Sequence, residues 1–399
     1  MEAGRRHVAL AVMLAFLLLL VPISGCASAP ESDGNGDGTE VKEPYRIGAV
    51  LSLSGTFAGL GEPEKNTIEM EVERINADGG INGRPLEVVY EDDKTDSEAA
   101  VAATSRLIDR EGVLAIIGSS GTGATMGMRG EINRAGIAQV SLAGGTVITA
   151  EFDPLVFQTP WSNSLVVPFT LEYLQNEGIT KVGLITDTGG FGADGQAVIK
   201  AAASDFGIEI LAEETFNQGD TDMSGQLTKI KSSGAEAVVM WTAGREAATI
   251  AKNLADLGLG IPLIGSHGNA RVEMIEGAAG AAEGFRFAAG KVLIPESYGP
   301  DTENFAVATD FIERYTDRYG KAPDTFAGHA FDGLYLIVDA MKRLDEGFTA
   351  ADLRDEIEAT RGFVGIGGTF TFSSTDHNGL TADDLVVYEV KDGAWVLAE

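Results

Sequence analysis

The chain has 399 residues, of which 44% are hydrophobic and 22% charged, and its formal net charge at pH 7 is −31. A chain of this length is expected to form about two domains, and the composition is typical of a globular protein rather than a disordered one. Because a phosphate backbone is bound by clustered Lys and Arg, the acidic balance argues against nucleic acid as a partner.

The N-terminus has the pattern of a secretory signal. Arg5 and Arg6 precede an uninterrupted apolar stretch over residues 8–21, which is shorter than the roughly 20 residues that a spanning helix needs. The segment "ISGC" that follows ends at Cys26 and resembles the lipobox of secreted lipoproteins, in which the cysteine is lipidated. We therefore predict a signal peptide over residues 1–25 and a lipid anchor at Cys26, with a permanent membrane anchor helix as the alternative.

The residues after the signal read as a linker. Residues 26–44 are small, polar and acidic, without apolar periodicity, and we expect a flexible tether. Within them "DGNGDG" copies the start of a calcium loop, but the bidentate Glu would fall on Pro44, so no metal site is predicted. Cys26 is the only cysteine, which excludes an intrachain disulfide and a thiolate metal site.

From Tyr45 onward, short apolar runs alternate with amphipathic ones. The apolar runs predict strands, and Ile68, Val72 and Ile75 show the helical spacing that places apolar side chains on one face. The predicted strands of this first run are residues 46–51, 85–93, 113–118 and 136–145, with helices predicted over residues 97–112 and 126–135.

The same layout then repeats. Predicted strands begin at residues 181, 207, 235 and 261, and helices lie between them, one of which carries Ile199, Ala203 and Phe206 on one face. Strands that alternate with helices form parallel sheets covered by helices on both faces. We therefore predict an α/β protein with two doubly wound parallel-sheet lobes of similar build.

The loops that leave the predicted strands are rich in Gly, Ser and Thr. Ligands of open parallel sheets bind beyond the carboxyl ends of the strands, so two such rims that face each other would form a cleft. The six loops are "LSLSGTFAGLG", "GSSGTGATMG", "SLAGGT", "TDTGGFGADG", "WTAGRE" and "GSHGNA".

The motifs of nucleotide binding and nucleophilic catalysis do not occur in the chain. Gly121, Gly123 and Gly127 read GxGxxxG after the third strand, and the next strand ends without the acidic residue that binds a ribose. Neither GxxxxGK[ST] nor GxSxG occurs. We therefore predict no nucleotide cofactor.

The histidines do not form a catalytic constellation either. His329 lies in an amphipathic helix, where a packed or surface histidine is more common than a base, and His377 in "SSTDHNG" reads as a solvated turn residue. His267 alone lies in a rim loop, and one histidine does not make a mechanism. We predict a binding protein without enzymatic activity, cofactor or metal.

The opening of the first run resembles a known family. The segment "IGAVLSLSGTFAGLGEPEKNTIEMEVERINADGGINGRPLEVVYEDDKTD" is similar to the start of extracytoplasmic solute-binding proteins of the leucine/isoleucine/valine-binding type, most clearly at "INADGGINGRPLE". The likeness extends from about Tyr45 to the C-terminus and is looser after about Ile294. It implies the type I periplasmic-binding fold, in which two lobes joined by three crossovers close on a small solute. It also implies an ABC importer as partner, usually one for branched-chain amino acids or related compounds.

The resemblance implies how the carboxylate of a solute would be held. In that family, backbone N–H groups and a hydroxyl on two loops of the first lobe bind it, and the glycines allow the backbone to approach an anion closely. The positions that match are Thr122, Ala143, Gly144, Gly145 and Thr146.

Two further positions match side-chain-facing positions of the family's cleft, and a third residue lies at a predicted crossover. Leu60 and Phe191 stand where the family often has aromatic residues; Leu60 departs from that pattern, and ordinary core packing is the alternative for Phe191. Trp161 lies at the first predicted crossover, where it either lines the cleft or packs in the hinge.

One departure from the family bears on the solute. Amino-acid binders of this type place an acidic residue for the ammonium group in the last rim loop, where this chain has His267, and the neighbouring loop offers Gly244 and Arg245. A neutral imidazole supplies one acceptor and no full charge. Either Glu246 or Glu273 reaches in, or the solute has no α-ammonium group. We favour a small carboxylate- or amide-bearing solute, with a branched-chain amino acid still open.

The predicted protein is thus a monomeric, lipid-anchored solute receptor of an ABC importer on the outer face of the cytoplasmic membrane. A ligand-sensing subunit of a signalling system with the same fold is the alternative. The predicted crossovers lie near residues 159–162, 288–292 and 365–368. The predicted domains are the signal peptide at 1–25, the lipid-anchored linker at 26–44, lobe 1 at 45–160 plus 290–366, and lobe 2 at 161–289 plus 367–399.

Overall fold

The computed structural model describes residues 42–398. The predicted signal peptide, Cys26 and nearly all of the predicted linker therefore lie outside the described residues. Across the described part of the chain, no helix combines the length and the apolar character that crossing a bilayer requires.

The first sheet has five parallel strands in the order β2-β1-β3-β4-β5. In β1, Ile47, Ala49 and Leu51 pack into one core while Val50 packs into another on the opposite face. Both faces are buried, as a parallel sheet requires. The strands are β1 (Tyr45–Leu51), β2 (Leu86–Asp92), β3 (Ala115–Gly118), β4 (Ala138–Ser141) and β5 (Val156–Gln158).

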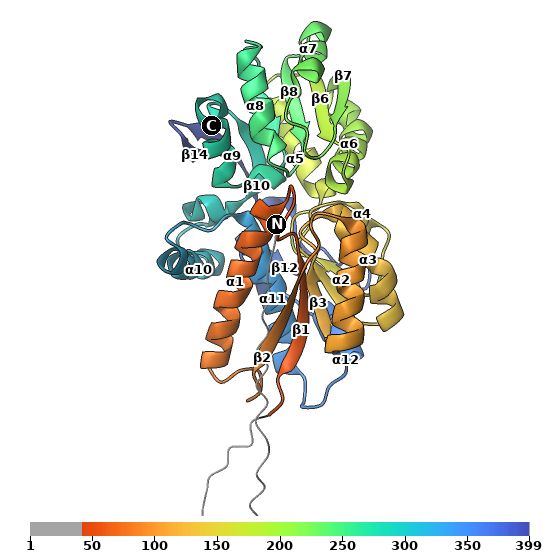
Figure 1. Ribbon diagram of the computed structural model, residues 1–399. Helices are drawn as coiled ribbons and strands as arrows, with labels where there is room; N and C mark the ends of the chain where they lie inside the picture. The colour runs from red at the N-terminus through yellow and green to blue at the C-terminus, as the bar shows by residue number, and fades with distance from the viewer. Residues whose placement is uncertain (1–41, 399) are drawn as a thin grey trace, which may run out of the picture. The chain divides into compact units, whose positions relative to one another are not determined.

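Helices cover both faces of this sheet (Figure 1). The apolar stripes of α1, α11 and α12 pack on one face, and those of α2 and α3 on the other. The helices around the first sheet are α1 (Ala58–Ala77), α2 (Ser97–Arg106), α3 (Thr122–Ala135), α4 (Val147–Ala150), α10 (Glu303–Tyr319), α11 (Thr325–Arg343) and α12 (Ala350–Glu358).

The second sheet repeats the strand order of the first. Its order is β14-β13-β10-β9-β8-β6-β7. The strands β6 to β10 are parallel, and β13 and β14 are antiparallel additions at one edge. In each sheet the strand order reverses beside the first strand, which creates a topological switch point there. In the first sheet the loops after β1 and β3 lie at this point, and in the second sheet the loops after β6 and β8 do. The strands are β6 (Lys181–Asp187), β7 (Glu209–Phe216), β8 (Ala237–Trp241), β9 (Leu263–Gly265), β10 (Arg286–Gly290), β13 (Leu385–Lys391) and β14 (Ala394–Leu397).

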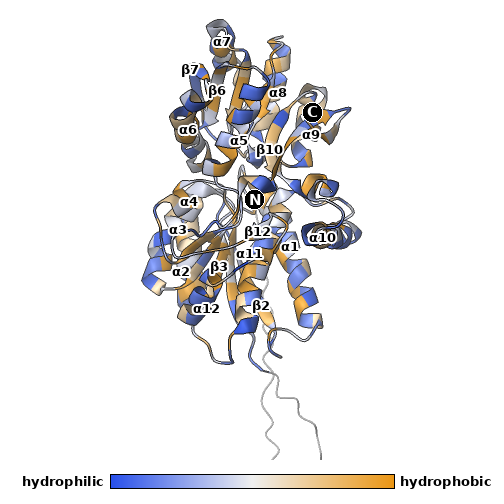
Figure 2. Ribbon diagram, turned by 180° about the vertical axis from the view of Figure 1, so that it is seen from behind, coloured by the Kyte–Doolittle hydropathy of each residue, from blue (hydrophilic) through white to orange (hydrophobic). Residues whose placement is uncertain are grey.

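The second sheet is also buried on both faces. Val239 and Trp241 of β8 pack toward α5 and α6, whereas Val238 and Met240 pack toward α7 and α8. Coloured by hydropathy, the strands of both sheets form the apolar interior, with polar residues on the outer faces of the helices (Figure 2). The predicted fold class is confirmed. The helices of this second set are α5 (Asn163–Asn176), α6 (Gly190–Ala202), α7 (Ser224–Ser233), α8 (Glu246–Asp256) and α9 (Val272–Ala278).

The chain passes three times between the two sheets: between β5 and α5, between β10 and α10, and between β12 and β13. The small hairpin of β11 (Phe363–Val364) and β12 (Thr369–Phe370) precedes the third passage. Residues 371–378, which the sequence assigns to lobe 2, contact β5 of the first sheet. The Gln158 N–H donates to the His377 carbonyl (3.0 Å), and the Asn378 side chain donates to the Gln158 carbonyl (3.2 Å).

The prediction that His377 is a solvated turn residue is wrong. Its side chain is only 1% exposed, its ring stacks on Phe157, and Nδ1 lies 2.9 Å from the Val156 carbonyl oxygen. The turn folds back onto a strand more than 200 residues earlier in the chain, and local composition carries no signal of such a contact.

A buried carboxylate joins three helices of the first lobe. Glu71 of α1 is 0% exposed and accepts hydrogen bonds from Arg74 (2.9 Å), from Tyr335 of α11 (2.7 Å) and from Arg314 of α10. Removing one member of a buried ion-pair network leaves the remaining charges without partners, which destabilises a protein strongly.

We expect Glu71→Ala to lower the free energy of unfolding by about 1 to 3 kcal/mol, because Tyr335 and Arg74 lose a buried hydrogen-bond acceptor while Arg314 keeps its ion pair with Asp310. Urea denaturation of the full chain measures this change. Glu73→Ala is the matched control on the same helix, since Glu73 is largely exposed and pairs only with Arg318 at the surface, and it should leave stability nearly unchanged. Equal effects of the two substitutions would contradict the role of Glu71.

Candidate functional site

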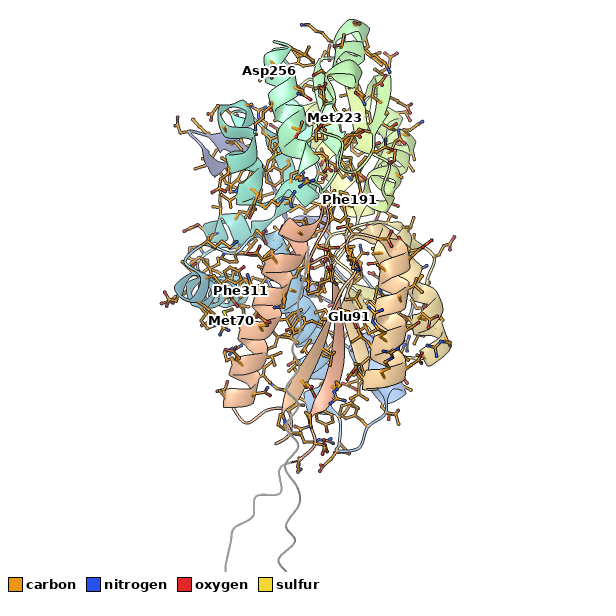
Figure 3. The ribbon with its side chains drawn as sticks, in the orientation of Figure 1. Met70, Glu91, Phe191, Met223, Asp256 and Phe311 are labelled. Atoms are coloured by element: carbon orange, nitrogen blue, oxygen red, sulfur yellow. The ribbon has the colours of Figure 1, made fainter. Side chains whose placement is uncertain are left out.

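A narrow cavity lies between the two lobes at the carboxyl ends of the parallel strands. Its walls come from loops of both lobes and from the first turns of α1, α3, α6 and α11. Phe191, at the start of α6, lies where the second lobe faces the first (Figure 3). The lining residues are Phe57, Leu60, Ser120, Gly121, Thr122, Leu142, Ala143, Gly144, Pro160, Phe191, Ala243, His267, Gly268, Phe326 and His329.

Polar side-chain atoms without partners line this cavity. The Thr122 hydroxyl, both ring nitrogens of His267 and Nδ1 of His329 are buried and have no hydrogen-bond partner among the described residues. By contrast, the Ser120 hydroxyl is engaged, because it accepts from the Ser52 N–H (2.9 Å) and bonds to the carboxyl group of Glu64. A buried polar group without a partner costs free energy, so these three side chains mark where a polar ligand would be stabilised.

The two histidines are held neutral by their surroundings. His267 packs edge-on against Phe191, and His329 packs edge-on against Trp161 and Phe326. Burial lowers the pKa of His267 to about 3, and burial together with the nearby His267 lowers the pKa of His329 to about 3. Within residues 42–398, none of the lining side chains is an Asp, Glu, Lys or Arg. The side chains of the cavity wall are therefore uncharged at neutral pH.

The lobes approach each other so closely that glycine is required at the contact. A Cβ atom added to Gly144 of the first lobe would lie 2.3 Å from Nε2 of His267 of the second lobe. A Cβ atom on Gly190 of α6 would lie 2.7 Å from the backbone nitrogen of Gly123 of α3. These contacts show that the lobes are closed on the cavity.

The family model described as "Periplasmic binding protein" matches residues 44–394, which is most of the chain. The chain belongs to the periplasmic binding protein family. Among curated relatives, the Leu/Ile/Val-binding protein homolog 3 of Brucella melitensis biotype 1 is 25% identical and aligns over 87% of this chain and 91% of that protein.

Solved structures agree with this membership. The branched-chain amino acid transporter substrate-binding protein of Streptococcus pneumoniae in complex with isoleucine has a TM-score of 0.79 and 26% identity, covering 88% of this chain and 97% of that one. An ABC transporter solute-binding protein of Rhodopseudomonas palustris in complex with benzoate has a TM-score of 0.77 and 25% identity, covering 89% of this chain and 95% of that one.

These findings confirm the predicted resemblance to binding proteins of the leucine/isoleucine/valine type. Members of the periplasmic binding protein family bind solutes outside the cytoplasm for transporters and are not enzymes, so the prediction of a non-enzymatic binding protein is confirmed at the level of the family.

The structure brings together six of the ten residues predicted to bind the solute. These six come from both lobes, and each contributes to the wall of the cavity. They are Leu60, Thr122, Ala143, Gly144, Phe191 and His267.

The other four predicted residues lie outside the cavity wall. The Gly145 carbonyl accepts from the Gln158 side chain (3.1 Å), and Trp161 packs beside His329 as a buried hinge residue. The Thr146 N–H donates to Asp194 (2.7 Å). Gly244 lines a different cavity.

Asp194 connects the lobes through hydrogen bonds. It belongs to α6, is 8% exposed, and accepts from the backbone N–H groups of Thr146 (2.7 Å) and Val147 (3.2 Å) at the start of α4. It also accepts from the side chain of Asn163 (2.7 Å), which in turn accepts from the Trp241 indole (2.9 Å). The carboxylate thus caps a helix of the opposite lobe in the closed arrangement.

A second cavity lies beside the first, with about 670 Å³ not filled by atoms. Gly244, Arg245, Arg271 and Glu273 are among its lining residues, and the Arg271 guanidinium donates to the Ala243 carbonyl (2.8 Å). Glu246 is buried and accepts from the Gly219 N–H. Neither Glu246 nor Glu273 therefore lines the first cavity. The sequence had left open that one of these two residues receives the ammonium group of a solute.

Sequence reasoning assigned no site role to Phe57, Phe326 or His329. Phe57 immediately precedes α1 and Phe326 lies in the first turn of α11. His329 lies one turn into α11, far along the chain from every other first-lobe residue of the wall except Phe326. The one available signal was a histidine on the apolar face of a helix, which more often marks ordinary packing than a site.

The neutral histidines predict acid sensitivity of the protein without solute. The pKa of each imidazole is about 3 in the folded protein and about 6.5 when unfolded, so the unfolded chain binds more protons between these values. Stability contributed by each group is present above pH 6.5 and is lost as the pH falls toward 3. Going from pH 7 to pH 5, we expect each histidine to remove about 2 kcal/mol.

Urea denaturation of the unsubstituted chain and of His267→Phe at both pH values measures this contribution. The substituted chain should lose about 2 kcal/mol less than the unsubstituted one over the same pH change. An identical pH dependence of the two chains would show that His267 is accessible to protons in the folded state.

Proposed function

We propose that this protein binds a small carboxylate-bearing solute in the cavity between its lobes and delivers it to the permease subunits of an ABC importer. The solute is an amino acid of the branched-chain type or a related amide or organic acid. The observation that carries the proposal is the unpaired Thr122 hydroxyl, which is 1% exposed and faces the cavity.

The position of Thr122 supports an anionic group on the solute. Thr122 is the first residue of α3, a helix of 14 residues, and a helix N-terminus carries unpaired N–H groups and a partial positive charge. Gly121 and Gly144 beside it leave the backbone open to close approach. The isoleucine and benzoate named for the two solved relatives are both carboxylates.

The proposal includes a cycle of opening and closing. Closure brings Thr122 of the first lobe and His267 of the second to one cavity, and solute contacts with both lobes would favour the closed state. We place lobe 1 at 45–160 plus 290–366 and lobe 2 at 161–289 plus 367–399, except that we assign residues 367–378 to the first lobe, because β12 pairs with β11 and the residues after it bond to β5.

Thr122→Ala should weaken solute binding by about tenfold or more, because it removes a hydrogen bond to a charged group. Thermal-shift screening of the full chain against amino acids, amides and aromatic acids identifies a solute, and titration calorimetry then compares the variants. Thr309→Ala on α10, outside the cavity wall, should bind like the unsubstituted chain. Unchanged affinity in Thr122→Ala would remove this hydroxyl from the site.

The proposed location is the outer face of the cytoplasmic membrane, where a lipid on Cys26 holds a monomeric protein after removal of residues 1–25. In cells that express the full chain, Cys26→Ser should move the protein from the membrane fraction to the soluble fraction. Ser32→Ala, in the linker, is the control and should stay with the membrane. Retention of Cys26→Ser in the membrane would instead support a permanent anchor helix.

A further inference from the structure

The first cavity has no group that can balance a positive charge on a solute. None of the side chains on its wall, all of which lie within residues 42–398, is a carboxylate. The nearest carboxyl group that bonds to the wall is that of Glu64, which lies behind Ser120, and burial raises its pKa well above its usual value. Glu64 is not on the wall, and Ser120 stands between its carboxyl group and a solute in the cavity.

An ammonium group in this cavity would be buried against two neutral imidazoles and the ring of Phe191. The two neutral imidazoles and the Thr122 hydroxyl could accept hydrogen bonds from an ammonium, but none of them carries a negative charge, so its charge would stay uncompensated. Taking a charge out of water without a counterion costs several kcal/mol even after relaxation. The α-ammonium group, which distinguishes an amino acid from a simple carboxylic acid, therefore disfavours the binding of amino acids in this cavity.

A carboxylate finds suitable partners in the same cavity. His267 and His329 each offer one N–H in the neutral form, and Thr122 offers an O–H, so up to three donors from two lobes could reach two oxygens. No Lys or Arg lines the described wall to balance a carboxylate, but the partial positive charge at the start of α3 and these hydrogen bonds to an ionised acceptor offset its desolvation. A bound carboxylate would thus supply hydrogen-bond partners to Thr122, His267 and His329 at the same time.

The rest of the wall fixes the character of the solute's body. Phe57, Leu60 and Phe326 from the first lobe and Phe191 from the second present apolar surface. A compact hydrocarbon group, branched or aromatic, buries its surface there without leaving a polar group unsatisfied.

We infer that the solute is an apolar monocarboxylic acid without an ammonium group, whose carboxylate is bound by Thr122, His267 and His329 and whose hydrocarbon body fills the space between the phenylalanines. This inference rests on the proposed function and narrows its solute class. It also assigns His329 to the site as a residue that determines specificity.

Matched pairs of solutes test the inference on the unsubstituted full chain. Isoleucine is compared with β-methylvalerate, and phenylalanine with hydrocinnamate, so that each pair differs only by the amino group. Titration calorimetry should give a dissociation constant at least about 100-fold lower for the acid than for the amino acid in one pair or both. Hydrocinnamamide, which lacks the carboxylate, should bind more weakly than hydrocinnamate.

The outcomes separate the inference from the proposed function. Amino acids that bind as tightly as the acids, or more tightly, would overturn the inference and leave the proposed carboxylate binding intact. If no acid or amino acid of the panel binds, or if the amide binds best, both the inference and the proposed carboxylate class fall.

Histidine variants test the assigned contacts. His267→Phe and His329→Phe keep an aromatic ring but remove the N–H donors, and each should weaken acid binding at least about tenfold. His377→Phe is the control of the same type, because His377 is equally buried but bonds to Val156 and Glu358 away from the cavity. Circular dichroism checks that each variant is folded. If folded His267→Phe and His329→Phe bind acids as the control does, the assignment of the histidines is wrong.

Discussion

The site depends on a close contact between the two lobes, which is made mainly by backbone and glycine. Gly190 of α6 lies against the backbone of Gly123 in α3, and Gly144 lies against the imidazole of His267. A single Cβ atom at Gly144 or Gly190 would overlap the opposite lobe, so the approach is available only where no side chain intervenes. The same approach brings the start of α3 and the loop after β9 to one cavity, although they belong to different sheets.

The balance of satisfied and unsatisfied polar groups defines the chemistry of the cavity. Asp194, Asn163 and Trp241 of the second lobe form a connected set of hydrogen bonds, and Asp194 extends it to the Thr146 N–H of the first lobe. On the wall of the first cavity, the Thr122 hydroxyl and the ring nitrogens of His267 have no hydrogen-bond partner among the described residues, and apolar side chains surround them. A protein interior tolerates such atoms where a ligand completes their hydrogen bonds, which is why the chemistry of the solute can be inferred from the protein alone.

Much of the fold could be predicted from the sequence, because the spacing of apolar residues is a local property. The strands around Ile47 and Val239 and the helix that carries Ile68 all follow from it. The site could be predicted only where a motif marks it, as at Thr122. His329 and the burial of His377 could not be predicted, because both depend on packing between segments that are far apart in the sequence, and nothing local specifies which surfaces meet.

Asp194 gives the closed protein an anion of its own. Held by the fold, its carboxylate occupies the amides of Thr146 and Val147 at a high effective concentration. A dissolved acid would have to displace this tethered competitor in order to use those two amides. If the proposed solute is an acid, its carboxylate would therefore meet the neighbouring hydroxyl and imidazoles, and selection among acids would rest on the group behind the carboxylate.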